Sequence, residues 1–364
     1  METMAIAGRQ GGGMRISAIW HSAALMALAV LLAMAGTAHS SEITDLYSSM
    51  DSADITVQGN VAGMDLRLDL VDKEKDGAIL ASRNLTLDGA GTWTVSWPEL
   101  DVEKGSYEIC AHLRSNGTLV SGKCQNFYYG GVEPIRFDVR DFCADSRGMH
   151  LAISASDPTI VDIYYMLIDG NKAAYVTREQ AVAISGSFAM PVTRDYAWKQ
   201  ILERGHRYAG RVKIVELNHN LTRSFMNSFT AIEDAKITET YQDETGASAT
   251  VMGNSRVPFK GILRFILSQN GTVLNITEKP TPVLLTGDDE TVEIAWNKTL
   301  EQGIYQLRTV LLGQSGEVVD LEEDVIESKP LVKSNTTDTE KKASFPAEAC
   351  ALALFTIVLL RRRR

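Results

Sequence analysis

One short pattern occurs three times in this chain, at intervals of about a hundred residues. Each copy has a tryptophan at the end of a strand-like stretch, a short connection, and a glycine just before a strand that begins with tyrosine. Three copies in register predict three domains of one type in tandem. The copies consist of Trp97, Gly105 and Tyr107, of Trp198, Gly205 and Tyr208, and of Trp296, Gly303 and Tyr305.

Apolar and polar residues alternate after each tyrosine. In the first copy Tyr107, Ile109 and Ala111 share one face, which predicts a strand with one buried side. Each unit has room for about seven short strands in about 90 to 100 residues, without a long helical period. The chain is therefore expected to be all-β, with three tandem β-sandwich domains. Earlier strands are expected at residues 64–71, 161–168 and 261–267.

The connection between tryptophan and tyrosine has the form apolar-x-x-Gly-x-Tyr at residues 102–107 and 300–305. Residues 202–208 have one additional residue between Gly205 and Tyr208. This form resembles the tyrosine corner of immunoglobulin-like and fibronectin type III domains, where the tyrosine hydroxyl bonds back to the connecting loop. The resemblance implies immunoglobulin-like sandwiches. We interpret the three tryptophans as core residues rather than ligand contacts.

The repeat and the composition divide the chain into six segments. The linkers between the sandwiches are short, so the array is expected to be an elongated rod with limited bending. The expected segments are a signal peptide at 1–40, sandwiches at 42–134, 135–234 and 235–328, a disordered polar stalk at 329–345 and a hydrophobic anchor or sorting tail at 346–364.

The N-terminus has the features of a secretory signal. Arg9 and Arg15 precede an uncharged apolar run at residues 23–35, and small residues flank His39. Met14 offers an alternative start. We expect an N-terminal signal helix that is cleaved near residue 40, and the alternative is a retained membrane helix.

The C-terminus combines Phe345-Pro346, an apolar run at residues 349–360 and four terminal arginines at residues 361–364. A helix of this run would span about 18 Å, against about 30 Å of hydrocarbon, and the arginines would stay on the cytoplasmic side. The layout resembles the PGF-CTERM and PEP-CTERM sorting signals of archaeal and bacterial surface proteins. That resemblance implies that the tail is replaced by another anchor, often a lipid. The alternative is a simple tail anchor, because Phe-Pro-Ala departs from Pro-Gly-Phe.

The chain has a net charge of −10, and the part without the terminal arginines is more negative still. This charge argues against nucleic acid and anionic membrane surfaces as partners. Asn-x-Ser/Thr sequons are more frequent than chance and suggest a glycoprotein outside the cell. The expected N-glycosylation sites are Asn84, Asn116, Asn220, Asn270, Asn275, Asn297 and Asn335.

Two of the four cysteines are symmetric about a strong hairpin turn, Asn116-Gly117. Cys110 and Cys124 would therefore lie opposite each other on adjacent strands, close enough for a disulfide. The alternative is two free thiols in a reducing compartment. Cys143 lies between repeats and Cys350 in the tail, and no second Cys or His pair has the spacing of a metal site.

Candidate chemistry is sparse. The stretch from Asp72 to Gly77 imitates the start of a calcium loop, but the twelfth position would be Arg83, so a solvated hairpin turn is expected. The histidines after residue 40 are not in a metalloprotease spacing, and no nucleophile elbow or phosphate loop occurs. We therefore expect no catalytic residues, no cofactor and no enzyme activity.

These features favour a non-enzymatic structural or adhesive protein of the cell surface, associated with the envelope or S-layer and tethered to the membrane by its C-terminal tail. Its expected partners are other envelope proteins or glycans. The alternative is an extracellular binding module for carbohydrate or a solute, for which Tyr128-Tyr129 and Tyr164-Tyr165 are the best stacking candidates. An extracellular hydrolase is a third alternative.

Overall fold

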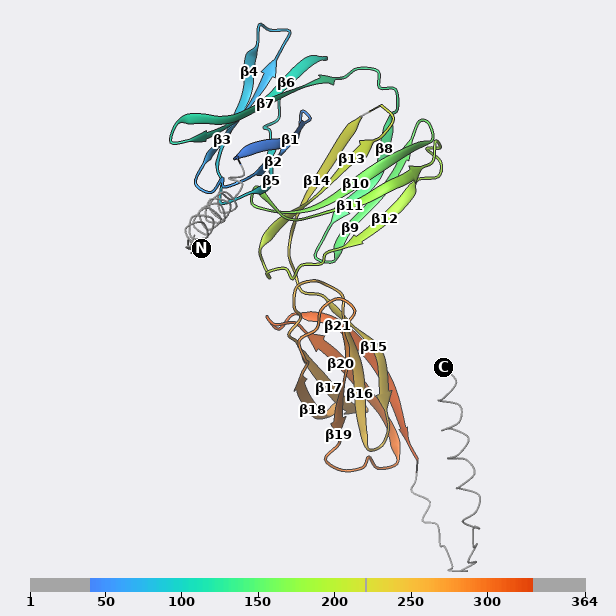
Figure 1. The fold of residues 1–364 in the computed structure, drawn as a ribbon. Coiled ribbons are helices and arrows are strands. Elements are labelled where there is room, and N and C mark those ends of the chain that lie inside the picture. The colour runs from blue at the N-terminus through green and yellow to red at the C-terminus, as the bar shows by residue number, and fades with distance from the viewer. Residues whose placement is uncertain (1–39, 220, 330–364) are drawn as a thin grey trace, which may run out of the picture.

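The computed structural model describes residues 40–219 and 221–329. All the elements of regular secondary structure in these residues are β-strands (Figure 1). The expected all-β class is confirmed. The signal segment, nearly all of the stalk, the C-terminal tail, Asn220 and Asn335 lie outside these residues. Within the described part of the chain, no helix is long and apolar enough to cross a membrane.

Three groups of seven strands repeat one topology, and we name them domains 1, 2 and 3. Domain 1 contains β1 Glu42–Ser48, β2 Ser52–Gln58, β3 Asp65–Asp72, β4 Ala78–Thr86, β5 Gly91–Ser96, β6 Gly105–Ser115 and β7 Thr118–Tyr129. Domain 2 contains β8 Phe137–Ala144, β9 Gly148–Ala155, β10 Thr159–Asp169, β11 Lys172–Ile184, β12 Val192–Ala197, β13 Arg207–Glu216 and β14 Thr222–Thr230. Domain 3 contains β15 Ala235–Gln242, β16 Gly246–Gly253, β17 Ile262–Gln269, β18 Thr272–Pro280, β19 Asp289–Ala295, β20 Gly303–Leu312 and β21 Val318–Ser328.

In each domain the first, second and fifth strands pair with one another, as in β15-β16-β19. The other four strands form a second sheet in the order fourth, third, sixth and seventh, as in β4-β3-β6-β7. Antiparallel pairing with a period of two places apolar side chains of both sheets in one core. In β6, for example, Tyr107, Ile109, Ala111 and Leu113 are buried while the residues between them are not.

Three hydrophobic clusters of buried residues correspond to the three domains. They contain Trp97, Trp198 and Trp296 respectively, together with the inward-facing residues of both sheets. Each cluster is built mainly from Val, Ile, Leu and aromatic residues. Burial of one such side chain stabilises the fold by about 1.5–3 kcal/mol, so each domain has its own source of stability.

Domains 1 and 2 are joined edge to edge rather than end to end. Trp93 of β5 pairs with Lys172 of β11, and the amide of Thr94 donates to the carbonyl of Asn171 at 2.7 Å. This pairing makes a seven-stranded sheet across both domains, in the order β1-β2-β5-β11-β10-β13-β14. The expected elongated rod is therefore wrong for these two domains, which lie side by side, while domain 3 extends away from them (Figure 1).

Candidate functional site

The repeated tryptophans are buried and hold the turn between the first two strands of each domain. The indole Nε1–H of Trp198 donates to the carbonyl of Asp145 at 2.7 Å, and that of Trp296 donates to the carbonyl of Asp243 at 3.0 Å. In domain 1, the equivalent bond from Trp97 goes to the Ser48 hydroxyl at 3.0 Å. Satisfying a buried indole N–H in this way anchors the ring in one orientation.

The turns that accept these bonds share a feature that sequence reasoning missed. The Asp145 carboxylate accepts the amides of Arg147 and Gly148 at 2.7 and 3.2 Å, and Asp243 accepts those of Thr245 and Gly246 at 2.7 and 3.0 Å. An aspartate side chain that accepts hydrogen bonds from the backbone amides of the second and third residues after it is typical of a tight turn. The signal was present as Asp-x-x-Gly at residues 145–148 and 243–246.

The repeated tyrosines have the geometry of a tyrosine corner. The hydroxyl of Tyr107 donates to the carbonyl of Glu103 at 2.6 Å, and that of Tyr305 donates to the carbonyl of Glu301 at 3.0 Å. Tyr208 instead accepts the amide of Glu203 at 3.3 Å. The additional residue in this second copy changes the partner from a carbonyl to an amide, but the ring still ties the connecting loop to the strand.

The repeated glycines have two different physical roles. A Cβ on Gly303 would lie 2.7 Å from Nε2 of Gln269, and one on Gly105 would lie 3.0 Å from the Glu74 carboxylate, so both glycines allow a close approach. Gly205 instead has φ of +76°, in the left-handed region that side chains disfavour.

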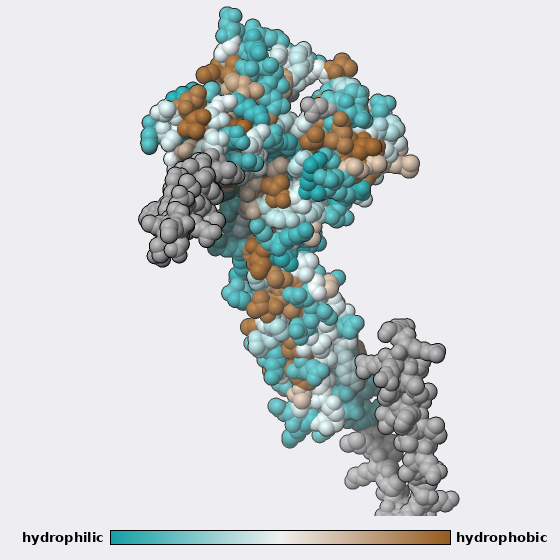
Figure 2. All heavy atoms as spheres, in the orientation of Figure 1, coloured by the Kyte–Doolittle hydropathy of each residue, from teal (hydrophilic) through white to brown (hydrophobic). Residues whose placement is uncertain are grey.

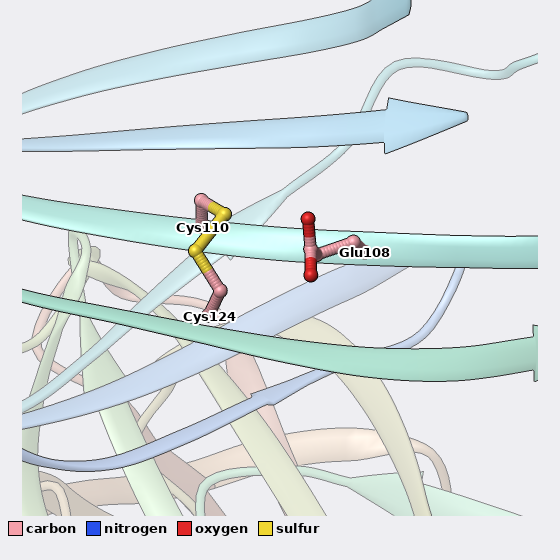
Figure 3. A group of neighbouring side chains, drawn as sticks. All are labelled: Glu108, Cys110 and Cys124. Atoms are coloured by element: carbon pink, nitrogen blue, oxygen red, sulfur yellow. A yellow bond between two sulfur atoms is a disulfide. The ribbon is translucent and has the colours of Figure 1, made fainter. Parts of the chain in front are cut away.

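The disulfide expected from the hairpin is present between Cys110 and Cys124. The two residues are direct partners in the register of β6 and β7, and the turn between the strands is at Asn116, which has φ of +49°. Glu108 lies beside the bridge on β6 (Figure 3). These three residues are the one metal-sized cluster in the described residues, but both sulfurs are consumed in the disulfide, so the group does not offer thiolate ligands.

Replacing both Cys110 and Cys124 with serine is expected to lower the free energy of unfolding by about 3 kcal/mol, because the bridge closes a short loop of the unfolded chain. Thermal or urea unfolding measures this loss. Cys143→Ser, at an exposed free thiol, is the matched control and is expected to leave stability unchanged. Equal unfolding midpoints for the double variant and the control would contradict a stabilising bridge.

Most described sequon asparagines are accessible. Asn275, on β18, is half-buried. The corresponding strand of domain 2, β11, is not an edge strand, because it pairs with β5 of domain 1, and it has no sequon. Glycans on the exposed edges of β4 and β18 would block pairing with other chains, which is a known hazard of edge strands. The exposed asparagines are Asn84, Asn116, Asn270 and Asn297.

The calcium-like stretch is a hairpin turn between β3 and β4. The buried Asp72 carboxylate accepts the amides of Glu74 and Lys75 at 2.9 and 3.3 Å, and Glu74 accepts the amide of Ser106 at 3.0 Å. Asp76 and Gly77 have φ of +51° and +75°. These carboxylates bind the protein's own backbone, so the arrangement supports a structural turn.

Cys143, His150 and Asp195 lie opposite one another on β8, β9 and β12. The His150 ring is bonded to Asp195 at 2.6 Å, and its other nitrogen is 3.8 Å from a carboxylate oxygen of Asp141. Desolvation is the largest effect that raises the pKa of the Cys143 thiol, and repulsion from the Asp141 carboxylate raises it further. At neutral pH the thiol is therefore protonated, which makes it a poor nucleophile.

The junction of domains 1 and 2 contains a buried charge network that sequence reasoning missed. Arg211 of β13 is fully buried and donates to Ser52 at 2.6 Å and to Asp54 at 2.7 Å, both on β2. Lys213 donates to Asp54 at 2.7 Å and to Asp45 at 3.0 Å. Two cations and two carboxylates balance across the junction, as a buried ionic group requires.

The charge state of Lys213 depends on this balance. Burial acts to lower the pKa of its ammonium, but attraction and hydrogen bonding to Asp54 and Asp45 outweigh burial and raise it above the ordinary value of 10.5. The contribution of Lys213 to stability is present at neutral pH and is lost only as pH rises through this raised value. Lys213 is therefore protonated at neutral pH.

Domain 3 is joined to domain 2 through the loop between β16 and β17. Val257 in this loop belongs to the hydrophobic cluster of domain 2. The amide of Arg256 donates to the carbonyl of Ser146 at 2.9 Å, and its carbonyl accepts the amide of Leu202 at 3.0 Å. Arg204 of domain 2 pairs with Glu233 at 3.2 Å, whose carboxylate in turn accepts backbone amides of domain 3. These contacts limit bending between the two domains.

Acidification is expected to destabilise the chain, because several carboxylates are held ionised in the folded state. Hydrogen bonds from Thr245 lower the pKa of Asp243 below 3.8, and the Ala181 amide and then Arg178 do the same for Asp162. Their stabilising effect is present above the unfolded pKa and is lost as pH falls through the lowered folded pKa. Urea titrations at a series of pH values measure this slope. Asp243→Asn retains an acceptor oxygen for the backbone amides of the turn but removes the charge, so it should reduce the dependence of stability on pH. An unchanged pH dependence in this variant would contradict a stabilising role for the ionised Asp243.

A cleft of about 790 Å³ lies between domains 1 and 2. Its walls are the turn between β1 and β2, the end of β7, the linker at residues 130–134 and the start of β14. Tyr128 and Tyr129, which the sequence singled out for stacking, line it with 60% and 43% of their surfaces exposed. Of the second pair, Tyr165 is in the core and Tyr164 is half-buried beside Arg178.

No protein-family model and no curated protein matches this chain. Among solved structures, a tetra-tandem repeat from the extending region of a large adhesion protein is similar at TM-score 0.22 and 8% identity, covering 79% of this chain and 74% of that one. Escherichia coli alpha-2-macroglobulin activated by porcine elastase is similar at TM-score 0.20 and 13% identity, over 78% of this chain and 32% of that chain. Bacteroides uniformis beta-glucuronidase is similar at TM-score 0.21 and 13% identity, over 50% of this chain and 26% of that chain.

These scores are too low to carry an inference about activity. The chain spans less than a third of the alpha-2-macroglobulin that it matches.

Proposed function

We propose that this chain is a non-enzymatic structural or adhesive protein of the cell surface, built from three immunoglobulin-like sandwiches. The observation that carries the proposal is the construction of both junctions. A shared sheet and a buried ionic network hold domain 1 on domain 2, and shared core contacts hold domain 3 on domain 2. Three domains held as one unit suit a spacer that keeps a surface at a fixed distance from its anchor.

The immunoglobulin-like assignment rests on two features. Each domain opposes a three-stranded and a four-stranded antiparallel sheet, and each has a tyrosine that ties its connecting loop to the sixth strand. Both features are typical of the immunoglobulin and fibronectin type III sandwiches.

An extracellular location is supported by the disulfide and by the exposed sequons. Structural disulfides persist in oxidising compartments, and a glycan needs an accessible asparagine. The N-terminal signal that the sequence predicts agrees with such a location.

A C-terminal tether fits the direction of the last strand. β21 ends at the pole of domain 3 that lies farthest from domain 2 (Figure 1). A tail attached there would place domain 3 nearest the envelope and domains 1 and 2 outermost. Figure 2 shows apolar side chains on the viewed face in separate patches among polar ones, which suits a solvated projecting surface.

Intact mass measurement of the native protein, combined with protease treatment of whole cells, tests this proposal. We expect a mass that lacks the leader and carries glycan, and a chain that external protease removes. Deleting residues 346–364 should release the protein into the medium. A glycan-free chain that stays protected inside intact cells, or one that stays in the envelope after this deletion, would refute the proposal.

A further inference from the structure

We propose that the cleft between domains 1 and 2 binds a neutral oligosaccharide, with Tyr128 and Tyr129 as stacking surfaces. This goes beyond the structural role and does not depend on it. At about 790 Å³ the cleft falls within the usual range of ligand pockets, roughly 300–1,000 Å³, and it lies at a domain interface, where such pockets are frequent.

The two tyrosines offer the apolar part of the site. They are the last residues of β7, where the chain leaves the sheet at Gly130-Gly131, and both are exposed residues of the cleft lining. A Cβ on Gly131 would lie 2.6 Å from Cδ1 of Tyr128, so the backbone passes directly against that ring and supports one side of it. An aromatic face with a hydroxyl at its edge suits a sugar ring, which has apolar C–H faces and hydroxyls around its rim.

The remaining lining selects for a polar, uncharged ligand. Gln125 and Ser49 also line the cleft and carry an amide and a hydroxyl, which suit the hydroxyls of a sugar, while Asn126 in the same lining accepts a hydrogen bond from Lys73. Arg223 is paired with Glu133, so this cation does not serve as an anion site. Asp51 adds a carboxylate, and the chain as a whole is negative. Acidic sugars and phosphates would be repelled, which leaves neutral oligosaccharides as the favoured class.

The walls of the cleft are held in place before any ligand arrives. Tyr47 of β1 donates its hydroxyl to the carbonyl of Thr222 at the start of β14 at 3.2 Å, and nearby the Asp54 network ties β2 to β13 across the same two domains. A pocket that is already ordered loses less conformational entropy on binding.

The test measures binding of soluble neutral oligomers of glucose, galactose, mannose and N-acetylglucosamine to the full chain by saturation-transfer NMR and calorimetry. Tyr128→Ala and Tyr129→Ala are compared with Tyr241→Ala, which removes a tyrosine of similar exposure (64%) from domain 3. We expect at least one oligomer to bind. Either cleft variant should weaken it by roughly thirtyfold in Kd, Tyr128→Phe should largely retain binding, and Tyr241→Ala should leave it unchanged.

Three results would overturn the proposal. They are no binding of any neutral oligomer at millimolar concentration, a preference for acidic over neutral oligomers, and equal losses in Tyr241→Ala and the cleft variants. None of these results touches the structural role, which is tested by location and release. Circular dichroism of each variant checks that the fold is intact.

Discussion

Asp54→Ala is expected to lower the free energy of unfolding by about 3–5 kcal/mol, because it leaves two buried cations without their shared counter-ion. Arg211 is fully buried and Lys213 nearly so, and both bond to this one carboxylate. Neither cation has access to enough water to compensate. Because the network bridges β2 and β13, the same change should also loosen domain 1 from domain 2.

Urea unfolding gives the stability loss, and small-angle scattering of the folded protein gives the change in shape. Arg207→Ala, on the same strand but exposed, is the control and should change stability by less than about 0.5 kcal/mol. The combined variant Asp54→Leu, Arg211→Met and Lys213→Met should recover most of the loss, since apolar residues of similar size often replace a buried ionic network at little cost. A loss below about 1 kcal/mol for Asp54→Ala would show that water reaches the network.

Trp198→Ala is expected to cost about 3–5 kcal/mol, the usual penalty for truncating a buried aromatic side chain. The ring is 2% exposed and stacks near Phe229 at 6.1 Å between centroids. Truncation also leaves the carbonyl of Asp145 without its indole donor. The damage should be centred in domain 2, because each repeated tryptophan belongs to a separate hydrophobic cluster.

Trp198→Phe separates the two contributions, since it keeps most of the ring and removes only the N–H donor. It should cost about 1–3 kcal/mol, less than the alanine variant. Hydrogen exchange of the three domains locates the effect. Tyr241→Ala, at an exposed ring of domain 3, is the control. Equal costs for Trp198→Ala and this control would show that the repeated tryptophan is not a core residue.

The local structure of this chain was readable from residue patterns. Alternation of apolar residues after Tyr107 predicted the strand now seen as β6, because a strand places successive side chains on opposite faces. The Asn116-Gly117 turn predicted a hairpin that brings Cys110 and Cys124 together on adjacent strands, and a register shift between Leu113 and Arg114 makes them direct partners. Both inferences depend only on residues close together in sequence.

The contacts between domains were not readable in this way. Asp54 and Arg211 are more than 150 residues apart, and each occupies the outer face of a strand, where a charge ordinarily meets water. Only the edge pairing of β5 with β11 brings these outer faces together and removes the water. The same contact turns the expected rod into a side-by-side pair and creates the cleft beside Tyr128 and Tyr129.

The sequence by itself determined the strands, the three-fold repeat, the hairpin disulfide and the candidate stacking tyrosines. These follow from side-chain periodicity, turn chemistry and short-range spacing. The tertiary structure alone decided which outer faces are buried, which charges neutralise one another and where the tyrosines meet a cleft. Such features depend on the relative placement of whole domains, and that placement is set by sheet edges and surface complementarity between residues far apart in the chain.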